Sequence, residues 1–128
     1  MYRMRCTKPE VEARCRRLSC VHPTVCKLLG TDHRPTIELM RKARAVKGVK
    51  RVHVSSGVRM DLAAKSPDYL EELARHHVGG HLKVAPEHVS EKVLGLMKKP
   101  SNTSFDEFAE SFAAASKRAG KEQYLVPY

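Results

Sequence analysis

The chain has 128 residues, of which 41% are hydrophobic and 30% are charged. A chain of this length forms at most one domain with a core of its own, and its hydrophobic fraction excludes an intrinsically disordered protein. Its apolar runs are only a few residues long, which excludes a membrane-spanning helix. Residues 1–5 lack the apolar segment of a secretory signal peptide, so we expect a cytoplasmic protein in a reducing environment.

The positive charge is concentrated in one half of the chain. Residues 1–60 carry a net charge of +11 and residues 61–128 a net charge of −1. Such a basic half could face the phosphates of RNA, or it could be a solvated surface or meet an acidic partner segment. Because no aromatic side chains alternate with the arginines of residues 14–17, the solvated surface is favoured over nucleic acid as a partner.

All the cysteines lie in a basic, turn-rich segment with few apolar residues, residues 1–30. They are Cys6, Cys15, Cys20 and Cys26. Four thiols in a segment without a core indicate that a metal site or a pair of disulfides organises it, and a reducing compartment favours metal. Two neighbouring histidines, His22 and His33, are weaker candidates for a substitute ligand.

Helical patterns alternate with strand patterns along residues 31–128. The first helix is expected from about Pro35 to Val46, with a cap at Thr31 or Asp32 and an end at Gly48. The apolar side of this helix comprises Ile37, Leu39, Met40, Ala43 and Val46.

Further elements follow in the same order of helix and strand. A strand is expected at residues 49–55, a helix from the cap Ser66 to Gly79, and a short strand at residues 82–85. The apolar face of this second helix comprises Tyr69, Leu70, Leu73 and Ala74. His76, His77 and His81 could form a metal cluster, but a surface or helix-cap role is favoured because their spacing matches no usual ligand pattern.

The C-terminal part adds two helices and a strand. A short helix follows the cap Ser90, and a longer one is expected from a capping box of Ser104 and Glu107 to Gly120. The longer helix has an apolar face of Phe105, Phe108, Phe112 and Ala115. A third strand covers residues 123–128, and its unpaired edge predicts self-association or a missing neighbour.

This order predicts an α/β fold with a parallel sheet of about three strands and flanking helices. Ligands of such folds bind at the carboxyl ends of the strands. Here those ends contain Ser56, Arg59 and Asp61 after the first strand, and Glu87 and His88 after the second. Glu87 and His88 could hold hydroxyls, an amine or a proton in transit. Ordinary turn chemistry and a local ion pair between Arg59 and Asp61 are the alternatives.

Seven segments carry a more specific indication than any single residue. They are 19–26 (SCVHPTVC), 31–33 (TDH), 48–52 (GVKRV), 55–62 (SSGVRMDL), 76–88 (HHVGGHLKVAPEH), 97–100 (MKKP) and 120–128 (GKEQYLVPY). In this order and at these spacings, the chain resembles the YgiQ-type radical S-adenosylmethionine (radical SAM) proteins over essentially its whole length. The resemblance implies a partial parallel (β/α) barrel, a [4Fe-4S] cluster and S-adenosylmethionine, whose reductive cleavage gives a 5′-deoxyadenosyl radical.

The resemblance also implies roles for individual residues. Ser56, Arg59, Glu87 and His88 would line the cofactor face, with Glu87 the strongest candidate for the ribose hydroxyls. The Cys-x3-Cys-x2-Cys loop that holds the family's cluster is absent here, so we expect an internal fragment of the catalytic domain that is inactive alone. Residues 31–128 would be the partial barrel, and its partners would be the missing N- and C-terminal parts. The substrate and the catalytic residues are not indicated.

The four cysteines match family positions outside that loop. Their spacing, Cys-x8-Cys-x4-Cys-x5-Cys, fits neither a paired Cys-x2-Cys zinc pattern nor a ferredoxin pattern. An auxiliary iron–sulfur cluster, a zinc ion and unliganded structural thiols therefore stay open. The alternative function is a small metal-bound basic module that binds nucleic acid, and an inert structural remnant is a third.

Overall fold

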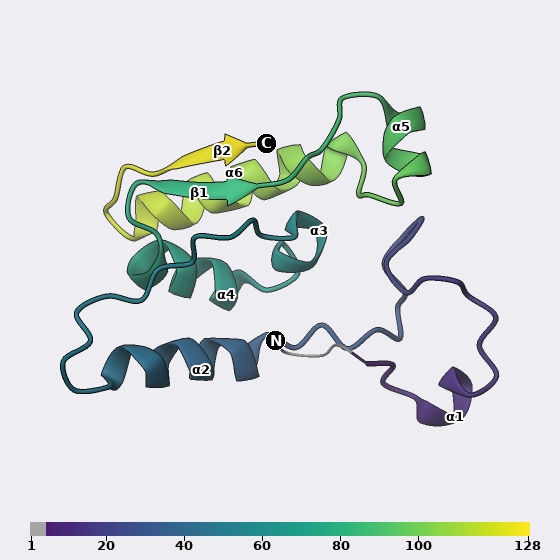
Figure 1. Ribbon diagram of the computed structural model, residues 1–128, viewed down its shortest axis with the longest axis horizontal. Coiled ribbons are helices and arrows are strands. Elements are labelled where there is room, and N and C mark those ends of the chain that lie inside the picture. The colour runs from purple at the N-terminus through teal and green to yellow at the C-terminus, as the bar shows by residue number, and fades with distance from the viewer. Residues whose placement is uncertain (1–4) are drawn as a thin grey trace.

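The computed structural model describes residues 5–128, so the expectation for the N-terminal residues 1–5 falls almost wholly outside the described residues. Helices occupy the first part of the described chain, and the strands come later, β1 after η1 and β2 after α6 (Figure 1). The elements are α1 (Pro9–Glu12), α2 (Arg34–Ala45), α3 (Met60–Ala63), α4 (Pro67–Glu72), the π-helix η1 (Leu73–His77), β1 (His81–Val84), α5 (Glu91–Leu96), α6 (Asn102–Arg118) and β2 (Tyr124–Pro127).

The strands of the described chain form a small parallel sheet of two strands. β1 and β2 pair in parallel from His81 opposite Tyr124 to Val84 opposite Pro127. A third segment joins at one point, where Val58 forms a parallel bridge with Val84 and its amide donates to the Lys83 carbonyl at 3.1 Å. The prediction of helices combined with a parallel sheet is therefore confirmed. Within residues 5–128 the sheet has two strands and this single bridge, where about three strands were predicted.

The strand predicted at residues 49–55 is wrong. The side chains of residues 51–54 alternate between exposed and half-buried, as expected, but this segment pairs with no strand within residues 5–128. Its polar groups bond to the end of η1 instead: the Val54 amide donates to the His77 carbonyl at 2.9 Å, and the His77 ring bonds to the Val52 carbonyl. The chain reaches β1 only further on, at Val58.

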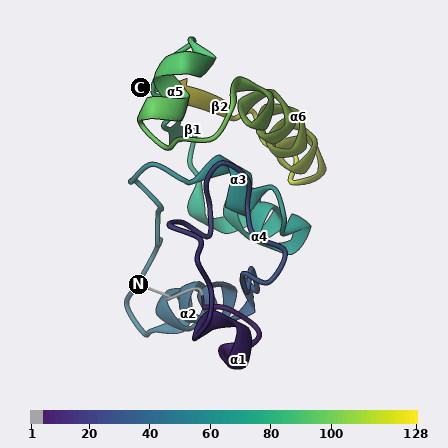
Figure 2. The same cartoon turned by 90° about the vertical axis from the view of Figure 1, so that its right-hand side faces the viewer.

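The core lies where α4, η1 and α6 pack together with the strands. Its largest fully buried side chains include Phe108, Phe112, Leu73 and Leu82. The apolar faces predicted for the second helix and for α6 are confirmed, with Tyr69 and Phe105 only partly buried at the edge of this cluster. Helix α6 runs alongside both strands (Figures 1 and 2), so its phenylalanines support the sheet that carries the candidate site.

Helix α2 begins and ends within one residue of its prediction. Asp32 accepts a hydrogen bond from the Arg34 amide at 3.0 Å, and the Arg34 guanidinium together with this amide lowers the pKa of Asp32 to about 2. Ile37 and Met40 are buried as predicted. Leu39 and Val46 are exposed, so their prediction as part of the apolar side is wrong: α2 packs on the rest of the fold through a narrow stripe.

Only some of the helix caps predicted after α2 are present in the structure. The Ser66 hydroxyl accepts from the Tyr69 amide, as predicted. Ser90 precedes α5 without a side-chain cap bond. The capping box of Ser104 and Glu107 is wrong, because α6 already begins at Asn102 and places both residues inside the helix. Gly120, with φ of +66°, follows the end of α6 as expected.

The cysteine-rich segment is closed by backbone pairing between its two ends. The Thr7 amide donates to the Leu28 carbonyl at 2.7 Å and the Gly30 amide to the Arg5 carbonyl at 2.8 Å. Cys6 and Leu29 form an antiparallel bridge between these bonds. Within the described part of the chain, this pairing gives the segment the order that its few apolar residues do not supply.

No helix of the described chain combines the length and the apolar composition that crossing a membrane requires.

Candidate functional site at the carboxyl edge of the sheet

Three chain segments end at the same edge of the sheet. The bridge between Val58 and Val84 and the pairing of Val84 with Pro127 place the residues that follow side by side. The Tyr128 amide continues this pattern by donating to the Val84 carbonyl at 3.1 Å. The carboxyl edge is defined here as residues 55–61, 85–88 and 128. Residues 55–57 precede the bridge at Val58, but Gly57 lies against Tyr128, so this segment also borders the ends of the strands (Figure 1).

Tyr128 lies against Gly57 at this edge. A Cβ added at Gly57 would lie 2.1 Å from the Tyr128 hydroxyl oxygen and 3.0 Å from its ring, so only glycine allows this approach. The tyrosine is 63% exposed, which leaves its ring open to solvent. Sequence analysis placed Tyr128 in a strand and missed this contact, which brings an aromatic ring and a hydroxyl to the edge.

Arg59 is held by a neighbouring carboxylate. Its Nε and Nη2 donate to the two oxygens of Asp61 at 2.8 and 2.9 Å, in the forked geometry that arginine forms with carboxylates. The local ion pair considered as an alternative for these residues is therefore present. Ser56, in contrast, is exposed and makes no side-chain hydrogen bond within residues 5–128.

Glu87 has an unusual backbone conformation. Its φ of +70° lies in the left-handed region, which few residues other than glycine adopt and which recurs at functional sites. Its Oε1 accepts from Lys99 Nζ at 2.6 Å, which ties the loop after β1 to the α5–α6 connection. Oε2 has no hydrogen-bond donor among the described residues, so the carboxylate retains one accepting oxygen.

The ring of His88 is oriented by its own loop. Its Nδ1 accepts from the Ser90 amide at 2.8 Å, so the proton of the neutral ring lies on Nε2. The edge thus offers a carboxylate oxygen at Glu87, an N–H donor at His88 and a hydroxyl at Ser56. These are groups that bind the hydroxyls and amines of a small polar ligand.

Three of the cysteines share one hydrogen-bonded stretch of backbone. The Cys26 amide donates to the Cys20 carbonyl at 2.7 Å, and the Leu29 amide, opposite Cys6 in the bridge, donates to the Cys26 carbonyl at 3.0 Å. Cys15 lies in the turn after α1. Among residues 5–128, no three His, Cys, Asp or Glu side chains are gathered as ligands of one ion.

Residues 17–24 of the cysteine-rich segment lie at the same end of the molecule as the carboxyl edge. A pocket of about 360 Å³ is lined by residues 17–19 and 22–24 together with Lys98 from the α5–α6 connection. Lys98 precedes Lys99, the partner of Glu87. Figures 1 and 2 show this loop rising between α3 and α5. The cysteine-rich segment is therefore close to the loop that carries Glu87.

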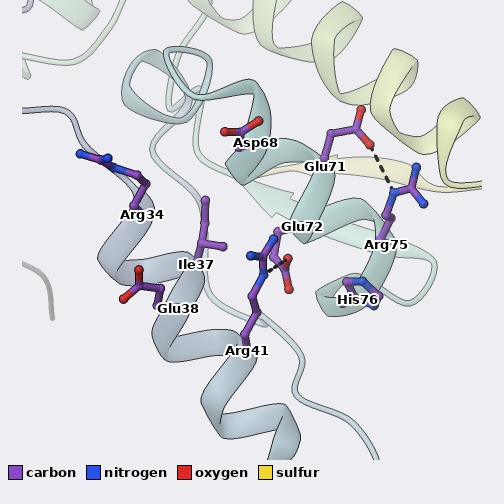
Figure 3. A pocket seen from close by; sticks show the side chains of 9 residues that line it. All are labelled: Arg34, Ile37, Glu38, Arg41, Asp68, Glu71, Glu72, Arg75 and His76. Carbon is purple, nitrogen blue, oxygen red and sulfur yellow. Dashed lines mark hydrogen bonds and ion pairs between the residues drawn. The ribbon is translucent and has the colours of Figure 1, made fainter.

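A buried ionic network lies between α2 and η1 (Figure 3), and sequence analysis missed it. Glu72, 4% exposed, accepts from Arg41 at 2.7 Å, Arg44 at 3.2 Å and His77 Nε2 at 3.2 Å. His77 is completely buried, so a surface role is wrong for it, although it does end a helix as predicted, as the last residue of η1. The five-residue spacing of Glu72 and His77 fits the π-helix η1, whose turns are wider than those of an α-helix.

The ring of His77 bonds to two partners that come from different parts of the chain. Nδ1 lies 2.7 Å from the Val52 carbonyl and Nε2 lies 3.2 Å from a carboxylate oxygen of Glu72. Burial would raise the pKa of Glu72, but the hydrogen bonds from Arg41 and His77 lower it. His77 therefore joins the end of η1 both to this carboxylate and to the segment before Val58.

The pocket beside this network is balanced in charge. It has a volume of about 460 Å³, and its lining carries three arginines and four carboxylates (Figure 3). Arg41 binds Glu72, and Arg75 binds Glu71 at 3.5 Å across one helical turn. Because cations and carboxylates neutralise one another here, the pocket is a seam between helices rather than a ligand site.

Sequence comparison finds close relatives along the whole chain. It is 56% identical over 128 residues to the UPF0313 protein YgiQ of Salmonella typhimurium, 55% identical to YgiQ of Escherichia coli and 53% identical to a UPF0313 protein of Chromobacterium violaceum. Each match covers 100% of this chain but only 17–18% of the relative. The chain thus spans less than a fifth of the length of these curated relatives. No family model and no solved structure matches the chain.

Proposed function

We propose that this chain is an internal segment of a YgiQ-type radical SAM iron–sulfur protein and that its carboxyl edge contacts S-adenosylmethionine. The observation that carries the proposal is the convergence of residues 55–61 and 85–88 at one edge of a parallel sheet. Parallel α/β folds bind their ligands at this edge. The identity to YgiQ proteins over the whole chain supports the same assignment. The substrate of the larger protein is not part of the proposal.

The groups at the edge suit the cofactor. The free oxygen of Glu87 accepts hydrogen bonds from ribose hydroxyls, and the Nε2 of His88 and the hydroxyl of Ser56 bind further polar groups. Arg59 lies close to this edge with its guanidinium held by the carboxylate of Asp61. When bound beside a reduced cluster, S-adenosylmethionine supplies radical chemistry. The chain's own residues bind and orient the cofactor and do not generate the radical alone.

Replacing Glu87 by alanine is expected to weaken binding of S-adenosylmethionine roughly tenfold to hundredfold in the full-length protein with its cluster reconstituted. One hydrogen bond to a charged group contributes about 1.5–3 kcal/mol, which corresponds to that range. Titration of the cofactor, followed by calorimetry, measures the effect.

Lys99→Ala is the matched control, because it breaks the ion pair of Glu87 but keeps the carboxylate. It should weaken binding much less than Glu87→Ala. If Glu87→Ala binds the cofactor as tightly as the wild type while its circular dichroism is unchanged, Glu87 does not belong to the site.

We further propose that Cys6, Cys15, Cys20 and Cys26 bind an auxiliary iron–sulfur cluster or a zinc ion. Thiolates are the usual ligands of both, and the hydrogen bond between Cys26 and Cys20 already brings two of them into one turn. Iron, sulfide and zinc are measured in anaerobically purified full-length protein and in Cys20→Ser/Cys26→Ser. The double variant should lose one cluster or one zinc ion, whereas an unchanged metal content would contradict the assignment.

A further inference from the structure

A second polar pocket lies at the opposite edge of the sheet. It has a volume of about 700 Å³, and its lining includes Lys50, Arg51 and His53, Gly79 before β1, and Lys121 and Glu122 before β2. The C-terminal ends of α2 and η1 add Arg44, Arg75 and His76. This amino-edge pocket faces away from the carboxyl edge, because the strands run from one to the other (Figure 1).

The lining of the amino-edge pocket is strongly positive. It contains five cationic side chains, from Arg44, Lys50, Arg51, Arg75 and Lys121. Its carboxylate is that of Glu122, which accepts a hydrogen bond from the Tyr124 hydroxyl. The pocket between α2 and α4 contrasts with it, because there the carboxylates balance the arginines.

Two of these cations have neither an ion pair nor a hydrogen-bond partner for their side chains within residues 5–128. Lys50 and Arg51 are exposed and form no ion pair or side-chain hydrogen bond with any residue between 5 and 128. Adjacent unpaired cations on a surface repel each other, which a bound anion would relieve. Arg44 and Arg75, in contrast, are oriented by Glu72 and Glu71.

Lys121 is positioned by neutral groups that leave its charge intact. Its Nζ donates to the Ala74 and Arg75 carbonyls at 3.1 and 2.8 Å, near the end of η1. Carbonyl oxygens fix the ammonium without cancelling its full positive charge. Fixed cations lose little side-chain entropy when a ligand binds, so this arrangement is preorganised for an anion.

The two histidines of the pocket are consistent with a positive potential. Desolvation lowers the pKa of His76, and the charges of Arg44, His77 and Lys121 lower it further against the opposing effect of Glu72. The ring of His53 lies over Gly79, where an added Cβ would be 3.7 Å from its Cε1. Both rings therefore lie in the same positive surroundings.

We propose that the amino-edge pocket binds a phosphate-bearing anion, either a small phosphate ester or the phosphodiester backbone of RNA. Arginine forks and lysine ammonium groups together are the usual protein ligands of phosphate. The volume is within the range of small-molecule sites. The proposal does not depend on the proposed contact with S-adenosylmethionine, which involves the other edge.

Calorimetric titration of the full-length protein with inorganic pyrophosphate at low salt tests the proposal. Lys50→Ala/Arg51→Ala removes the two unpaired cations and should weaken binding at least about tenfold, equal to about 1.4 kcal/mol. Lys65→Ala/Lys92→Ala is the matched control: it removes the same charge from two exposed lysines elsewhere, outside the lining of this pocket. Its effect should be less than about twofold, because the Coulomb energy between charges in water falls with distance and these lysines do not line the pocket.

Glu122→Gln should strengthen the binding of pyrophosphate, since it removes the negative charge of Glu122 from the lining and keeps an acceptor for Tyr124. A gain in affinity cannot result from unfolding. A competition experiment with a single-stranded RNA oligonucleotide distinguishes the two ligands. If the oligonucleotide displaces pyrophosphate, the ligand is the RNA backbone; if it does not, the ligand is a small phosphate ester. The proposal is overturned if pyrophosphate does not bind at low salt or if both double variants weaken its binding equally.

Discussion

Glu72→Ala is expected to lower the free energy of unfolding by about 3 kcal/mol at neutral pH. Removing one member of a buried ion pair costs about 3–5 kcal/mol when the other charge stays buried. Here two of the three partners, Arg41 and Arg44, have side chains that are 60% and 36% exposed and can be rehydrated. Only His77 is left fully buried, so the lower end of the range applies.

This loss depends on pH in a defined direction. The folded state lowers the pKa of Glu72 below its ordinary value of 4.5, so its contribution is complete above about 4.5. The contribution disappears as the pH falls through the lowered folded value, because the carboxylate is then protonated in both states. The difference between the wild type and Glu72→Ala should therefore shrink in acid.

Urea denaturation at several pH values measures both effects. Glu71→Ala is the control, since Glu71 also binds two arginines, Arg75 and Arg118, but is 27% exposed. Exposed ion pairs contribute about 0–1 kcal/mol, so Glu71→Ala should have a small effect. Equal destabilisation by the two variants would show that the burial of the Glu72 network does not matter.

Phe108→Ala is expected to destabilise the fold by about 3–5 kcal/mol, the usual cost of removing a fully buried phenylalanine. Phe108 is 0% exposed, and its ring stacks on that of Phe112 with centroids 6.2 Å apart. The cavity would open between α6 and the strands, beneath both edges of the sheet.

Phe105→Ala gives the comparison on the same helix, because Phe105 only borders the core. It should cost clearly less than Phe108→Ala in the same urea titration. If the two substitutions have similar effects, the core is not centred on Phe108 and Phe112.

Helix ends and apolar faces could be predicted where local chemistry decides them. Ser66 followed by Pro67 begins a helix because a hydroxyl and a fixed φ act within one turn. The strand at residues 49–55 could not be predicted correctly. Its alternation is real, but whether it pairs depends on the distant β1, and its polar groups found partners at His77 instead.

At the candidate site too, features set by neighbouring residues could be predicted, and contacts between distant residues could not. The alternation of helices and strands predicts that Ser56, Glu87 and their neighbours lie at one edge. The contacts that shape this edge join residues far apart in sequence, such as Lys99 with Glu87 and Tyr128 with Gly57. The π-helix that buries His77 is only five residues long, and over one turn its apolar spacing is the same as that of an α-helix. The sequence pattern therefore could not distinguish the π-helix from an α-helix.

Hydrogen–deuterium exchange of the full-length protein with and without S-adenosylmethionine tests the central claim most directly. We expect slower exchange in residues 55–61 and 85–90 when the cofactor is bound, because their amides lie at the carboxyl edge. We expect no change in residues 47–53 and 119–122 at the amino edge. Cofactor binding that leaves exchange unchanged in residues 55–61 and 85–90 would contradict the claim.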